Sequence, residues 1–129
     1  NHPHSVCRYF TGLAQLRAGN LQRAAFHFEE ADFDRRWPSK GLNEAPHAIV
    51  LYRLGDLNRA AEKLRSSDDE LDRWLQRLLD GDPLNGPWFD LLELLYFNEL
   101  AHQEINGSVP DRRDSLNGIR TASLSLFEQ

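Results

Sequence analysis

Glu99 and His102 are the pair of side chains whose spacing most suggests chemistry. Glu-x-x-His is the spacing of half a carboxylate-bridged dimetal site, in which both side chains leave one face of a helix. Such a site needs a second copy and further glutamates on facing helices, and we do not expect one here. His2 and His4 flank Pro3 near the first residue, where two ligands make at most an adventitious metal site. We therefore expect neither a metal nor a cofactor.

Motifs for nucleophilic and phosphate chemistry are also absent. The sequence has no Gly-x-Ser-x-Gly elbow, no His-Glu-x-x-His, no Cys-x-x-Cys and no glycine-rich phosphate loop. The adjacent carboxylates of Asp68, Asp69 and Glu70 suit the start of a helix better than acid–base catalysis. Cys7 lies among apolar residues, so we expect a buried thiol rather than a nucleophile. No catalytic residue is predicted, and the chain is not expected to be an enzyme.

Composition and charge narrow the range of possible partners. No stretch is apolar for long enough to span a membrane. The net charge is −5, and residues 44–107 hold thirteen acidic against six basic side chains. Because this acidic segment repels phosphate, nucleic acid and anionic membranes are not expected partners. A single cysteine fits a reducing, cytoplasmic setting. The sequence contains no methionine, so we expect a piece of a longer protein.

An internal repeat organises the first half of the chain. The segments 19–28 and 55–64 align without gaps, each reading Gly-polar-Leu-polar-Arg-Ala-Ala, with an apolar residue four positions after the first alanine. Each glycine is expected to close a helix in the left-handed conformation. Asn20 and Asp56 are then expected to cap the next helix, and the paired alanines allow two helices to approach closely.

This pattern resembles the tetratricopeptide repeat, in which small and large apolar residues follow a turn glycine at this spacing. The resemblance implies an all-α fold of antiparallel helical hairpins, an α-α superhelix, over residues 4–67. Departures are Ser67 where alanine is usual, a missing early aromatic residue and a longer repeat, with the insertion expected in a loop over 37–43. The residues that carry the resemblance are Gly12, Gly19, Leu21, Ala24, Phe28 and Ala31, then Ala48, Gly55, Leu57, Ala60 and Leu64.

The remainder is expected to cap the repeats. Residues 68–106 should form capping helices. Residues 57–80 fit either one long helix or two helices, the second of which would start near Ser67. The stretch from Trp88 to Ile105 is apolar nearly all round, which predicts burial on more than one side. Residues 107–129 are predicted to be a polar tail or a weak terminal helix.

A second resemblance concerns the run from Pro46 to Ile105. Its Tyr-Arg-Leu-Gly-Asp segment at 52–56 and its Trp88-x-Asp90-x-x-Glu93-Leu94 motif are similar to helical-repeat segments at the C-termini of large bacterial proteins. In those proteins such segments follow a serine/threonine kinase or propeller region. The resemblance implies a bacterial, multidomain parent.

Stacked hairpins line a concave face with their leading helices, and that face receives peptides or helices. The side chains that chaperone adaptors use to clamp a carboxylate are replaced here by Tyr9, Leu13 and Ile49, so a chaperone tail is not expected. We predict a non-catalytic scaffold that binds a protein or peptide. The alternative is a structural C-terminal cap that packs on upstream repeats or self-associates, with no ligand of its own. The candidate binding residues are Arg8, Thr11, Gln15, His47, Val50 and Arg53.

Overall fold

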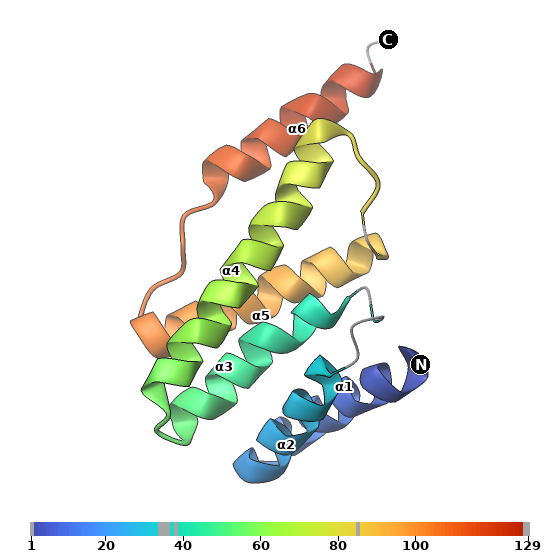
Figure 1. The fold of residues 1–129 in the computed structure, drawn as a ribbon. Helices are drawn as coiled ribbons and strands as arrows, with labels where there is room; N and C mark the ends of the chain where they lie inside the picture. Colours follow the sequence, from blue (N-terminus) through green and yellow to red (C-terminus); the bar gives the residue numbers. More distant parts are fainter. Residues whose placement is uncertain (1, 34–36, 38, 85, 128–129) are drawn as a thin grey trace.

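Helices make up the fold in a computed structural model of the protein, which describes residues 2–33, 37, 39–84 and 86–127 (Figure 1). No β-strand occurs in these ranges, so the all-α prediction is confirmed. The elements are α1 (His2–Arg17), α2 (Leu21–Asp32), the 3-10 turn η1 (Lys40–Asn43), α3 (Glu44–Arg53), α4 (Leu57–Asp80), α5 (Trp88–Asn106) and α6 (Arg113–Phe127).

Two glycine turns create the two helical hairpins, α1 with α2 and α3 with α4. Gly19 and Gly55 have φ of +82° and +87°, the left-handed conformation expected of them. Asp56 caps α4 by accepting a hydrogen bond from the backbone N–H of Arg59 at 3.3 Å. The same prediction for Asn20 is wrong, because its side-chain amide donates to Gln15 at 2.7 Å and makes no cap hydrogen bond.

The first hairpin closes through a contact between Gly12 and Phe28. A Cβ atom on Gly12 would lie 2.6 Å from the Phe28 ring, so only glycine lets α1 approach this closely. Ala24 and Ala31, on the same face of α2 as Phe28, are fully buried. The Phe28 ring also lies 5.9 Å from the ring of His47 on α3, so it contacts the second hairpin as well.

The segment between the hairpins fills space in the core. Trp37 is buried with its ring 5.6 Å from the ring of Tyr9. Asn43 at the end of η1 is fully buried, and its amide donates to the carbonyl of Phe28 at 2.6 Å and to Asp32 at 2.8 Å. The inserted residues therefore join the two hairpins.

α4 is one continuous helix through residues 67–70, so the interpretation of a new helix start there is wrong. Two polar side chains of this segment contact α5, and a third accepts a hydrogen bond within α4. Ser67 is fully buried and accepts from Asn98 at 3.0 Å, and Asp68 lies 2.7 Å from His102. Glu70 accepts from the indole N–H of Trp74 at 2.9 Å.

The C-terminal helices pack on the second hairpin. α5 lies against α3 and α4, and α6 lies against α4 (Figure 1). The guanidinium of Arg112, in the linker before α6, donates to the buried Asn98 at 2.7 Å. α6 forms in the segment for which the sequence left a tail and a weak helix open.

Overpacking the second hairpin should destabilise it. Ala60 is fully buried at the contact of α4 with α3, whereas the adjacent Ala61 is exposed. Ala60→Leu should therefore lower the free energy of unfolding by about 1–3 kcal/mol in urea denaturation. Ala61→Leu is the matched control and should change it by less than about 0.5 kcal/mol. Equal effects of the two substitutions would contradict the packing of α3 on α4.

Candidate interaction surface

One face of α5 is apolar and uncovered. Phe89, Leu92, Tyr96 and Leu100 recur at helical spacing and are between 41% and 59% exposed. The opposite face, with Leu94, Asn98 and Ala101, is buried against α3 and α4. The prediction that this helix is buried on more than one side is therefore wrong.

The exposed face of α5 borders a groove whose other wall is α1. The groove has a volume of about 730 Å³. Leu13 and Leu16 from α1 and Phe97 from α5 are its half-buried side chains. Phe10, Tyr96 and Leu100 stand more exposed at its edges. The remaining lining residues are Ala14, Arg17, Ala18 and Arg53.

Arg17 and Arg53 are the charged side chains that line the groove. Arg53, at the end of α3, donates two hydrogen bonds of 2.7 Å to the carboxylate of Glu104 on α5, which raises its pKa. Arg17 ends α1 and has no carboxylate partner among the described residues. Of the two arginines in the lining, Arg17 is therefore the one available to a partner.

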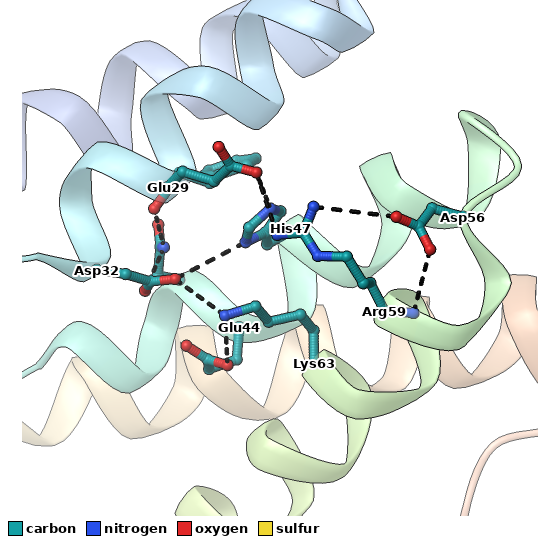
Figure 2. A network of polar contacts seen from close by, with 9 residues as sticks. Glu29, Asp32, Glu44, His47, Asp56, Arg59 and Lys63 are labelled. Atoms are coloured by element: carbon teal, nitrogen blue, oxygen red, sulfur yellow. Dashed lines mark hydrogen bonds and ion pairs between the residues drawn. The ribbon is translucent and has the colours of Figure 1, made fainter.

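A polar junction links α2, α3 and α4 (Figure 2). Lys63 lies 3.0 Å from Asp32 and 3.7 Å from Glu44, and Arg59 lies 3.1 Å from Glu29. Burial by itself would lower the pKa of Lys63, but the neighbouring Glu44 and Asp32 outweigh it and raise the pKa. Because these charges come from α2, α3 and α4, they orient the first hairpin, and hence α1, relative to the second.

His47 occupies the centre of this junction and is fully buried (Figure 2). Its ring nitrogens lie 4.0 Å from Glu29 and 3.9 Å from Asp32, too far for hydrogen bonds, and neither nitrogen has a partner. Burial, assisted by Lys63, lowers the pKa of His47 to about 4, against the opposing effect of the two carboxylates. The ring is therefore neutral at pH 7.

The structure removes two residues from the predicted binding set. His47 and Val50 are fully buried, because α3 is enclosed by α2, α4 and α5, so neither can contact a partner while the chain is folded. Arg53 is the one predicted residue that lines the groove.

The three candidates on α1 lie outside the groove lining. Arg8 contacts His27 at 3.2 Å and stacks over Phe26, the Thr11 hydroxyl donates to the carbonyl of Cys7, and Gln15 accepts from Asn20. Cys7 is exposed, which corrects the expectation of a buried thiol.

Sequence reasoning missed the aromatic and leucine residues that form the groove. The signal for them was the strongly apolar stretch from Trp88 onward, which contains more apolar side chains than one buried face can use. This excess of apolar side chains predicts burial on several sides, but an exposed face that binds a partner has the same composition.

The Glu99–His102 pair has no second ligand set around it. His102 faces Asp68 at 2.7 Å and Asn106 at 3.0 Å, and these contacts help to hold Asp68 near Arg112. No group of three or more metal-binding side chains occurs within the described residues. The side chains of His2 and His4 lie outside the part that the structure describes.

Comparison with known proteins returns no similarity to any protein-family model, curated protein or solved structure. Among the described helices, none combines the length and apolar character that crossing a membrane requires.

Lowering the pH should destabilise the fold through His47. An ordinary histidine has a pKa of about 6.5, whereas His47 in the folded chain has a pKa of about 4. The unfolded chain therefore binds more protons between these values, and stability present above pH 6.5 is lost as the pH falls toward 4. The loss should amount to about 3 kcal/mol.

Urea denaturation from pH 7 to pH 4 would measure this loss. His47→Gln provides the comparison. The carboxylates titrate in both proteins, so their effects cancel when the two pH profiles of the free energy of unfolding are subtracted. The remaining difference in slope reports His47. Parallel stability profiles for the two proteins would show that His47 does not contribute to the pH dependence.

Proposed function

We propose that the chain is a non-catalytic protein-interaction module that binds a partner protein in the groove between α1 and α5. The observation that carries the proposal is the exposure of Phe10, Tyr96 and Leu100 around one apolar hollow. Isolated exposed apolar residues are common on protein surfaces, but a contiguous aromatic patch with a concave centre is typical of an interaction site.

The tetratricopeptide-like architecture is part of this proposal. It is supported by the left-handed Gly19 and Gly55, by the contact of Gly12 with Phe28, and by the complete burial of Ala24 and Ala60. In such an arrangement α1, α3 and α5 are the leading helices, and the groove lies on their side of the molecule. The groove is therefore formed by leading helices, as the concave face of helical repeats is, although its second wall is α5 and not α3.

A structural cap is the second candidate function. The exposed Phe10 on α1 supports it, because a neighbouring repeat packed on α1 would cover this side chain. The two candidates differ in what occupies the groove. In a structural cap, another part of the parent chain fills the groove. In an interaction module, the groove is open and binds a separate protein.

Truncating the groove should abolish partner binding without unfolding the chain. Tyr96→Ala combined with Leu100→Ala removes two exposed side chains, so the melting temperature should hardly change. Each buried contact that is lost should weaken binding by at least about 1–2 kcal/mol, or about tenfold or more. Phe33→Ala is the matched control, because Phe33 is 78% exposed and lies outside the groove.

The measurement is quantitative capture of interacting proteins by the whole chain and by each variant, followed by affinity measurement with the captured protein. The proposal requires a protein that the wild type and Phe33→Ala retain and the groove variant loses. Equal retention by all three would overturn it.

A further inference from the structure

We propose that the occupant of the groove is an amphipathic α-helix of a partner protein, with acidic residues along the flank that faces α1 and basic residues along the flank that faces α5. This inference rests on the proposed function, and it specifies the chemistry of the partner.

The walls of the groove favour a helix over an extended peptide. Both walls are helices whose backbone groups are already hydrogen-bonded, and the polar side chains in the lining are two arginines. An extended peptide would bury its own N–H and C=O groups against apolar walls, which costs free energy when they lack partners. A helix satisfies these groups internally and presents only side chains to the groove.

The apolar stripe on α5 has the length that a helical partner needs. Phe89 and Leu100 lie at its ends, eleven positions or about 16 Å apart along the helix axis. Of this stripe, Tyr96 and Leu100 line the groove. Phe10 of α1 faces the same groove. A partner helix of three to four turns would cover this stripe with its own apolar residues at helical spacing.

The two helices that border the groove carry opposite net charge. α1 contains two arginines and no acidic residue, whereas α5 contains four acidic residues and no lysine or arginine. On α5, Asp90 is held by Ser39, Glu93 interacts with the buried Tyr9, and Glu104 is paired with Arg53. Glu99 has no ion-pair partner among the described residues, and it borders the stripe three positions after Tyr96.

Arg17 in the groove lining and Glu99, which borders the apolar stripe outside that lining, are therefore the charges available to an incoming helix. A partner that places a carboxylate beside Arg17 and a basic side chain beside Glu99 gains complementarity on both flanks. A helix with the opposite arrangement places like charges together on both sides.

A second copy of the chain fits this site poorly. Among the described residues, the apolar stripe that a second copy would offer lies on α5, which has acidic residues and no lysine or arginine. Docking α5 of one copy against α5 of another would bring like charges together, and each copy carries a net charge of −5. The charge pattern thus favours a different protein as the partner.

The test is a selection of displayed helical peptides on the whole chain. The peptides have about 18 residues, or about 27 Å as a helix, with leucine or alanine fixed along one face and all other positions random. We expect enrichment of acidic residues on one flank of the apolar face and basic residues on the other.

Charge exchange then checks the orientation with a selected peptide, measured by fluorescence polarisation. Arg17→Glu should weaken binding by about tenfold, and replacing the facing glutamate of the peptide with lysine should restore much of the loss. Arg23→Glu is the matched control, because it changes net charge equally at an exposed position of α2 outside the groove. It should leave binding nearly unchanged.

Three results would overturn the inference: selected peptides without charge preference, equal effects of Arg17→Glu and Arg23→Glu, or a dimer in sedimentation that Tyr96→Ala dissociates. If selected peptides lose binding to the Tyr96→Ala, Leu100→Ala protein but ignore the charge exchange, the groove remains an interaction site and only the partner chemistry is wrong. If they bind that protein unchanged, the proposed function fails as well.

Discussion

The position of the Phe28 ring is the constraint on which the rest of the structure depends. The ring fills the space over Gly12, which sets how closely α1 lies on α2, and it contacts His47, which fixes the first hairpin on the second. Its backbone carbonyl accepts from Asn43 and so holds the connecting segment. Because α1 is placed by these contacts and α5 by its packing on α3 and α4, the groove between them is a product of core packing. The surrounding charges of Lys63, Asp32 and Glu29 then restrict rotation of the hairpins about this point.

The features that sequence predicted well are those encoded locally. Gly19 and Gly55 end their helices because left-handed φ is easy for glycine, and that preference does not depend on distant residues. The buried alanines follow from helical spacing in the same way. The boundary near Ser67 was ambiguous because its polar residues suit a helix start as well as a helix interior. Their partners Asn98, His102 and Trp74 decide the matter, and the first two lie about thirty residues away.

The candidate site was harder to predict, since it depends on which helix faces remain uncovered. The assignment of partner contacts to the leading helices included α3. Because α5 packs against α3 and helps to enclose it, His47 and Val50 lie in the interior. The same packing leaves Tyr96 and Leu100 outside. Composition alone cannot distinguish an apolar face that meets the core from one that meets a partner, because both need the same residue types. Arg53 lines the groove because it ends its helix, beyond the enclosed part.

The length of α4 has a consequence for how the chain unfolds. Its first half is the second helix of a hairpin. Its later half contacts α6 and supports α5 through Ser67, Asp68 and Leu71. One helix of 24 residues therefore belongs to the hairpin and also packs against the C-terminal helices. Helical repeats ordinarily fray unit by unit from their ends, with each unit depending only on its neighbours. Here the hairpin cannot melt without removing the support of α5, so unfolding of the hairpin and loss of the groove become a single cooperative event.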